Sequence, residues 1–168
     1  DSELGMTPKG WEVGKLSDAG EIIGGATPSK KKAEYYTKNG IPWITPKDLS
    51  NKKTVFIEKG NIDISELGYR KASVRFYKKG TVLFSSRAPI GYIAIATVDG
   101  TTNQGFKSVQ PYKNKKISKE FIYCFLKKKL KSIKDFASGS TFPEISGEQM
   151  KHIKIVVPKV DALEQFNC

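Results

Sequence analysis

Apolar residues in the middle of the chain occur in short runs that end at glycine-containing turns. The runs at residues 74–76, 81–84 and 92–98 are rich in β-branched and aromatic side chains, which favours strands. Lys79-Gly80 and Asp99-Gly100 are turn signals at the ends of these runs. Similar short runs predict further strands at residues 11–16, 22–25, 41–44, 55–57, 62–64 and 153–157, of which the first is a strand or a turn.

Residues 118–136 follow the period of a helix instead. Their apolar positions recur three and four residues apart and share one face, which we expect to pack on a core; they are Phe121, Ile122, Phe125, Leu126, Leu130 and Ile133. Ser118 is the expected N-cap, and the helix is expected to end before Ser138 and Gly139. Cys124 lies within the apolar pattern and is expected to be a small core residue.

Short helical segments are expected in four other places. They are a turn or two over residues 29–36 capped by Ser29, a helix opened by Pro46, a turn capped by Ser65, and a segment whose capping box is Ser146 and Gln149. Helices and strands follow one another without a regular βαβ order. We therefore predict a single α+β (mixed α/β) domain with a curled, mostly antiparallel sheet and flanking helices.

Basic residues outnumber acidic ones, and this changes what the predicted domain is expected to bind. The 168 residues include 29 Lys and Arg against 17 Asp and Glu, a net charge of +12. Such an excess attracts phosphates and favours a polyanion as the partner. A lysine-rich solvated surface explains the same charge, because only Arg70, Arg75 and Arg87 are arginines. Charge alone leaves both interpretations open.

Residues that carry out chemistry are scarce. His152 is the single histidine and has no cysteine or carboxylate at metal-ligand spacing. The glycine-rich stretch at residues 24–32 lacks the spacing of an ATP-binding loop, and the acids that a nuclease needs are scattered. We therefore predict no catalysis, no metal, no cofactor and no small-molecule substrate.

Nothing in the sequence points to a membrane or to export. No apolar run approaches the ~20 residues of a membrane-spanning helix. The chain opens on acidic and polar residues that do not form a signal peptide, and its two cysteines make no disulfide framework. We therefore expect a cytoplasmic protein without a membrane partner.

Five polar or basic segments carry candidate binding groups. Residues 24–32 form a basic surface loop suited to a phosphate backbone. The amides of residues 102–106 either read a base edge or cap a turn while the phenylalanine packs. The hydroxyls and arginine of residues 85–87 either hold phosphates and bases or satisfy a tight turn. Residues 139–146 either bind a phosphate or form a turn that links two helices. The nine lysines of residues 113–134 contact phosphates, contact an acidic protein or form a solvated helix face.

Seven short motifs occur in order along nearly the whole chain. They are SELG (residues 2–5), PKGWEV (8–13), GATPS (25–29), IPWITPKDL (41–49), SSRAPIG (85–91), TNQGF (102–106) and GSTFPEIS (139–146). Together they resemble a target recognition domain of a type I restriction–modification specificity subunit. Each motif alone is weak, but seven in register are specific.

The resemblance implies a DNA-reading role without catalysis. Residues 1–158 would form the recognition domain for one half of a split target in double-stranded DNA, and residues 159–168 the truncated start of a conserved spacer helix. The implied partners are methyltransferase subunits, which bring S-adenosylmethionine, and through them the restriction subunit. Since only one recognition domain is present, the chain is a fragment, a half-subunit or an orphan cassette, and these three readings stay open.

On this interpretation lysines contact phosphates, while arginine, amide and hydroxyl side chains read bases. The predicted DNA contacts are Thr27, Ser29, Lys30, Lys31, Lys32, Lys47, Arg70, Arg75, Ser85, Ser86, Arg87, Asn103, Gln104, Lys107, Ser140 and Thr141. The arginines are expected at bases or the close backbone, because their fork suits guanine and phosphate. The alternatives are a protein-interaction module for an acidic or DNA-mimicking partner and a small DNA-modifying enzyme.

Overall fold

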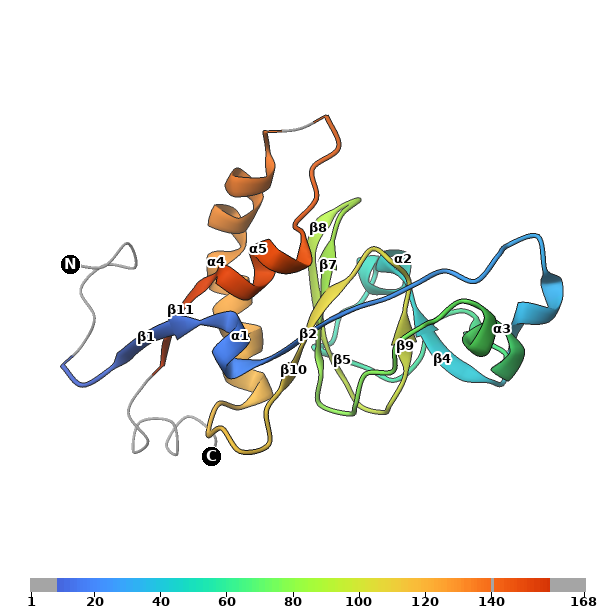
Figure 1. Ribbon diagram of the computed structural model, residues 1–168, viewed down its shortest axis with the longest axis horizontal. Helices are drawn as coiled ribbons and strands as arrows, with labels where there is room; N and C mark the ends of the chain where they lie inside the picture. Colours follow the sequence, from blue (N-terminus) through green and yellow to red (C-terminus); the bar gives the residue numbers. More distant parts are fainter. Residues whose placement is uncertain (1–8, 140, 158–168) are drawn as a thin grey trace.

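The computed structural model describes residues 9–139 and 141–157, and its largest element is a five-stranded sheet (Figure 1). The strands are β2 (Gly20–Gly24), β5 (Phe56–Ile57), β7 (Val82–Ser86), β8 (Ile90–Ala96) and β10 (Lys107–Pro111). Their order is β2-β10-β7-β8-β5, and all neighbours are antiparallel except β8 and β5. This sheet forms the middle of the molecule.

Two smaller sheets lie on either side of this middle layer. One contains β3 (Tyr36–Thr37), β6 (Asp63–Ile64), β4 (Ile41–Ile44) and β9 (Thr101–Thr102), in that order, with β4 and β9 parallel. The other pairs β1 (Glu12–Lys15) with β11 (Lys154–Val157) in antiparallel fashion. The first and last described strands therefore lie side by side, at the opposite end of the molecule from the four-stranded sheet (Figure 1).

The helices begin where the sequence provides caps. In α4 (Lys119–Ala137) the Ser118 hydroxyl accepts the Phe121 N–H at 3.1 Å, as predicted. The predicted starts at Pro46, after Ser65 and at the Ser146 capping box are confirmed as well. They open α2 (Pro46–Ser50), α3 (Glu66–Lys71) and α5 (Gly147–His152); α1 (Leu16–Ala19) and the 3₁₀ helix η1 (Ala33–Tyr35) are the remaining described helices.

Both faces of the five-stranded sheet are buried. Val82 and Phe84 of β7 belong to the apolar cluster under α4, while Leu83 points to the other face and packs with Ile44 and Phe106. Successive residues of a strand point to opposite faces, so a strand buried on both sides has apolar residues at every position. This explains the continuous apolar run that the sequence shows here.

The α+β class and the mostly antiparallel pairing are confirmed, although the strands are divided among three sheets. Residues 74–76 were predicted as a strand and this is wrong: only Tyr77 makes an isolated bridge, to Gly100. The apolar pattern there reflects packing instead, because Val74 is buried in a cluster with residues of β4 and β6. The predicted spacer-helix start at residues 159–168 lies outside the described residues.

Two further local predictions are wrong. Ser29 caps no helix, because only residues 33–35 are helical and Lys32 occupies their N-cap; the Ser29 carbonyl instead accepts the Lys32 N–H at 3.1 Å in a turn. Cys124 is exposed and not part of the core. It lies two residues from both Ile122 and Leu126, which places it on the opposite side of a helix with 3.6 residues per turn.

Candidate nucleic-acid interface

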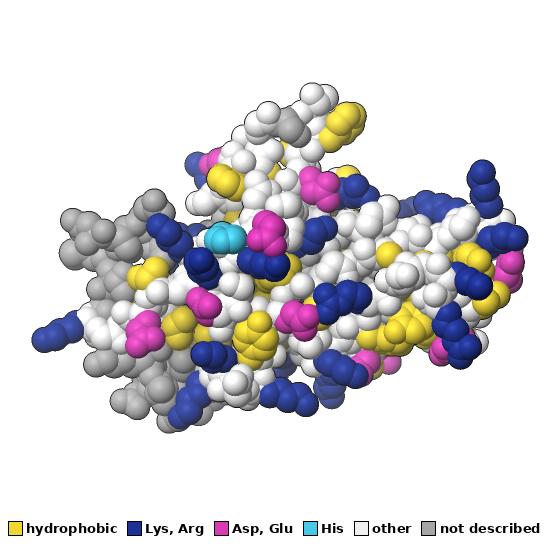
Figure 2. Space-filling view, viewed as in Figure 1, with side chains coloured by type: hydrophobic (Ala, Val, Ile, Leu, Met, Phe, Trp, Pro, Cys, Tyr) yellow, Lys and Arg dark blue, Asp and Glu magenta, His cyan; other side chains and the backbone are white. Residues whose placement is uncertain are grey.

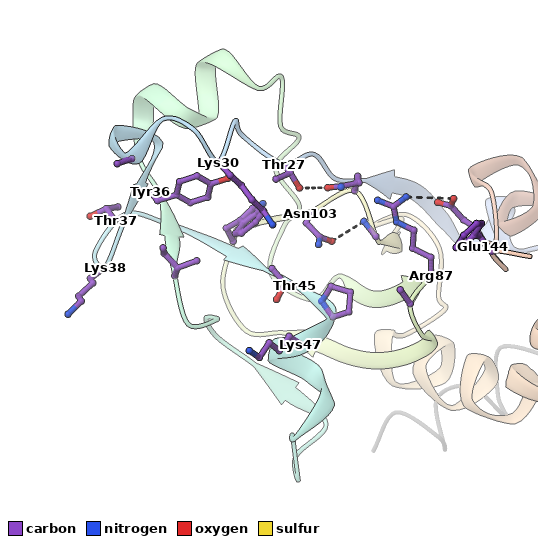
Figure 3. A pocket seen from close by; sticks show the side chains of 18 of the residues that line it. Thr27, Lys30, Tyr36, Thr37, Lys38, Thr45, Lys47, Arg87, Asn103 and Glu144 are labelled. Atoms are coloured by element: carbon purple, nitrogen blue, oxygen red, sulfur yellow. Dashed lines mark hydrogen bonds and ion pairs between the residues drawn. The ribbon is translucent and has the colours of Figure 1, made fainter.

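An open groove of about 1370 Å³ lies between the four-stranded sheet and the end of β7. Its walls come from the loop after β2, from β3 and β4, from the β7–β8 and β9–β10 connections and from the loop between α4 and α5 (Figure 3). Six of the predicted contact residues line it, namely Thr27, Lys30, Lys47, Arg87, Asn103 and Gln104. The fold thus gathers residues that are up to about eighty positions apart in the sequence.

Backbone hydrogen bonds hold the groove loops together. The Ala26 N–H donates to the Thr102 carbonyl and the Asn103 N–H donates to the Ile44 carbonyl, each at 3.0 Å. Gly25 is required at this junction, because a side chain there would collide with the carbonyl oxygens of residues 102 and 103. The two loops and the end of β4 therefore form one rigid wall.

An aromatic pair that also lines the groove packs against the same wall. The Tyr36 and Trp43 rings meet edge to face with centroids 5.6 Å apart. The Trp43 Nε1–H donates to the Ala26 carbonyl at 3.0 Å, and the Tyr36 hydroxyl donates to the Pro28 carbonyl. Burial raises the pKa of the Tyr36 hydroxyl, so this group stays protonated and able to donate. Sequence reasoning missed both aromatic residues, because each also suits an ordinary core.

Hydrogen-bonding side chains face the groove from this wall. The Thr27 hydroxyl donates to Gln104 Oε1, and Asn103 Oδ1 accepts the Gly105 N–H at 2.9 Å (Figure 3). The turn interpretation of residues 102–106 is thus confirmed for Asn103 and for Phe106, which is fully buried. Gln104 instead bonds a side chain, and it is exposed. Both hydrogen bonds use the amide oxygens, and both residues line the groove.

Lysines line the same groove as these amides. Lys30, Lys38 and Lys47 line the groove and are exposed, and none of them has an acidic partner among the described residues. Lys31 and Lys32 are exposed next to Lys30. Sequence reasoning missed Lys38, because only the pairing of β3 with β6 brings its turn to the groove.

The end of β7 brings an arginine to the groove. The Ser86 N–H donates to the Gly105 carbonyl at 2.8 Å, which joins this strand end to the loop with Asn103 and Gln104. Arg87 follows directly and lines the groove together with Glu144 (Figure 3). Lys107, another predicted contact, is partly buried with its Nζ 4.0 Å from Glu144 Oε1.

The hydroxyls of Ser85 and Ser86 do not face the groove, because both residues are fully buried. The Ser85 hydroxyl donates to the Pro89 carbonyl at 2.7 Å and accepts the Tyr92 N–H at 2.8 Å. Ser85 therefore has the turn-stabilising role that was one of its two interpretations. The predicted contact at Ser86 would need a rearrangement of the strand end.

The remaining predicted contacts lie away from the groove lining. Arg75 is exposed and pairs with Glu21 of β2 at 2.6 Å. Arg70 is exposed in the last turn of α3. Ser29 and Thr141 are exposed in loops that continue into lining residues, and Ser140 lies outside the described residues. The structure thus separates the three arginines and brings only Arg87 to the groove.

Charge by itself does not locate the site. Figure 2 shows Lys and Arg side chains spread over the whole visible face and not gathered in one patch. No group of three or more His, Cys, Asp or Glu side chains that could hold a metal occurs within residues 9–139 and 141–157. In the same part of the chain, no helix combines the length and apolar character needed to cross a membrane. The groove is distinguished by its combination of amides, cations and open shape.

The known proteins with a similar sequence are specificity subunits of type I restriction enzymes. A family model for the type I restriction modification DNA specificity domain matches residues 8–165. The chain is 45% identical over 168 residues to the type I restriction enzyme MjaIX specificity subunit of Methanocaldococcus jannaschii. It is 32% identical over 162 residues to the HindI specificity subunit of Haemophilus influenzae.

Solved structures show the same fold. The HsdS subunit from Thermoanaerobacter tengcongensis matches with a TM-score of 0.73 at 18% identity, covering 98% of this chain and 37% of that one. A chain from a type I R-M system matches with a TM-score of 0.75 at 21% identity. The matches to the MjaIX and HindI subunits include 99% and 95% of this chain, respectively. They include only 38% and 34% of the length of those two relatives. The chain thus spans little more than a third of each.

Proposed function

The chain belongs to the type I restriction modification DNA specificity domain family, and from this premise we propose that its groove reads one half of a split target in double-stranded DNA. The observation that carries the proposal is the joining of Asn103, Gln104 and Arg87 in one open groove among exposed lysines. Base-reading groups and phosphate-binding groups are needed side by side for such a task.

The groups of the groove divide into two roles. Lys30, Lys38 and Lys47 contact phosphates, which gives affinity for any duplex and orients the domain. The amides of Asn103 and Gln104 and the Arg87 guanidinium present donors to base edges in the major groove. The rigid wall behind the amides supports this assignment, because a donor discriminates between bases only when its position is held.

The domain itself carries out no reaction in this proposal. The full-length protein positions methyltransferase subunits, and through them a restriction subunit, on a bipartite site, and the chemistry belongs to those partners. The chain covers little more than a third of its relatives, which leaves room in a longer protein for a second recognition domain and for the docking elements.

Methylome sequencing tests the proposal directly. Cells receive the complete system with this domain in its full-length specificity subunit, once as wild type and once as Gln104→Ala. We expect the variant to accept additional bases at one position of one half-site, since a lost base contact costs roughly 1–3 kcal/mol of discrimination. The other half-site is expected to stay unchanged.

Asn114→Ala is the matched control, because it removes an exposed amide outside the groove lining. It should leave the methylated motif as in wild type. An unchanged motif in both Gln104→Ala and Arg87→Ala would contradict the proposed reading surface.

A further inference from the structure

One carboxylate stands among the cations of the groove. Glu144 is the single acidic residue in the described groove lining, which also contains Lys30, Lys38, Lys47 and Arg87. A carboxylate at this position repels phosphates from the groove, so it opposes the affinity that the lysines provide. Its presence calls for a function other than attraction of DNA.

The position of Glu144 is fixed by the backbone. Residues 87 and 144 form an antiparallel bridge, and the Ile145 N–H donates to the Ser86 carbonyl at 3.0 Å. Ile145 is 1% exposed and belongs to the cluster under α4, so it anchors the loop next to β7. The Glu144 and Arg87 side chains therefore start from neighbouring backbone positions on two different segments.

The carboxylate lies between two cations. Glu144 Oε2 is 4.0 Å from Arg87 Nη1, and Oε1 is 4.0 Å from Lys107 Nζ. Arg87 and Glu144 are about two-fifths exposed, so solvent screens their pair and leaves it easy to rearrange. The guanidinium has further N–H donors that Glu144 does not occupy.

We propose that Glu144 is a positioning residue that directs Arg87 to a base edge and away from phosphates. A phosphate that approached Arg87 would place a second anion beside the carboxylate, which is unfavourable. The O6 and N7 acceptors of guanine carry no net charge, so Arg87 can contact them while it keeps its pairing with Glu144. The same argument applies to Lys107, whose attraction for phosphates is partly neutralised.

The inference rests on the proposed function, and it names guanine as the base that Arg87 reads. It further assigns to Glu144 a role in lowering the affinity for DNA that lacks the target. Because genomic DNA offers a vast excess of such sites, discrimination between the two kinds of duplex matters more than affinity alone.

Binding of the full-length specificity subunit, assembled with its methyltransferase subunits, to two labelled duplexes tests this role. One duplex carries the motif found by methylome sequencing and the other lacks it. With Glu144→Gln we expect affinity for the second duplex to rise roughly two- to fivefold, the range of an exposed ion pair. The slope of log K against log salt is expected to steepen by about 0.9, the value for one added phosphate contact.

Glu148→Gln is the matched control, because it makes the same change in net charge at an exposed acid of α5 outside the groove lining. It should alter neither the affinity for the second duplex nor the salt slope. Equal effects of the two variants, or no effect of Glu144→Gln, overturn the inference. Thermal unfolding of both assembled variants, expected at the wild-type midpoint, shows that folding is intact.

Arg87→Ala separates this inference from the proposed function. If Arg87→Ala weakens binding to the cognate duplex and Glu144→Gln changes nothing, the groove still reads DNA and only the role of Glu144 is overturned. If neither variant changes binding to either duplex, the proposed reading surface is overturned together with the inference. The inference is also overturned if Arg87→Ala relaxes the methylated motif only at positions that are not G·C base pairs.

Discussion

The five-stranded sheet and the four-stranded sheet are neighbours built by different means. Strands β2, β7, β8 and β10 have five to seven residues and only the edge strand β5 has two, and apolar side chains such as Val82 and Leu83 are buried in clusters on the two faces. Strands β3, β6 and β9 have two residues each and β4 has four, and the apolar cluster of this smaller sheet is limited to a few residues such as Ile41 and Ile64. Side-chain hydrogen bonds to the backbone support the smaller sheet, among them Trp43 to Ala26 at 3.0 Å and Thr101 to Pro42 at 2.8 Å.

The difference separates stability from shape. Burial of apolar area stabilises the five-stranded sheet. A core of this kind tolerates many sequences that keep the apolar pattern. The groove wall in the second region depends on particular close contacts at Gly25 and Trp43. We therefore expect substitutions in the first region to affect folding and those in the second to affect DNA binding.

The largest expected effect is loss of stability in the five-stranded sheet. Phe84 is fully buried under α4, and Phe84→Ala should lower the free energy of unfolding by ~3–5 kcal/mol, because it leaves a cavity. Chemical denaturation of the full-length subunit measures it. Phe136→Ala is the control, since Phe136 is 71% exposed and its loss should change stability by under ~0.5 kcal/mol. Equal effects of the two variants would show that burial of Phe84 does not stabilise the five-stranded sheet.

An intermediate effect is expected at the junction of the groove loops. Gly25→Ala places a side chain against the carbonyls of residues 102 and 103, so the wall must shift at a cost of ~1–3 kcal/mol. At a temperature where the variant stays folded, this loss of stability alone would hardly change binding. We nevertheless expect the affinity for the cognate duplex to fall clearly, because the groove wall has shifted. Gly139→Ala meets no atom within 4 Å and should bind as wild type. Normal binding by Gly25→Ala would show that the wall need not be rigid.

The smallest expected effect is at a single phosphate contact. Lys47→Ala should weaken binding to cognate and non-cognate duplexes alike and reduce the salt slope by about 0.9. Stability should not change, because Lys47 is exposed on α2. Lys128→Ala removes the same charge from the solvent face of α4 and should leave the slope as it is. A change in the methylated motif with Lys47→Ala would place this lysine at a base instead.

The site was predictable only in part. Polar motifs after strands offered Asn103, Gln104 and Arg87 as candidates, because amide and guanidinium groups can pair with base edges, and a role in turns was the alternative for both motifs. They also pointed to the serines before Arg87, whose hydroxyls turned out to satisfy backbone groups or to be buried. Glu144 was not recognised as a groove residue, because its pairing with Arg87 joins segments more than fifty residues apart.

Local features of the sequence by themselves determined helices α2 to α5 and strands β7 and β8, whereas α1 and strand β10 were not predicted. Ser118, Pro46 and Ser146 mark helix starts through contacts within three residues, and the helical period of residues 118–136 requires no knowledge of the rest of the chain. Net charge and the ordered motifs indicated a DNA-binding partner and a family. Helix starts and the helical period depend on residues close together in the sequence, whereas net charge and the order of the motifs are properties of the whole chain.

Only the tertiary structure decided which of many basic and polar side chains belong together. The 26 lysines look alike in sequence, and long-range pairings such as β3 with β6 and β4 with β9 bring a few of them into one groove with amides. The bridge between residues 87 and 144 adds an arginine and a glutamate to the same groove. Such pairings form through hydrogen bonds between distant segments, whose partners no local pattern specifies. The same long-range contacts set Glu144 beside Arg87 and thereby define the chemistry of the groove.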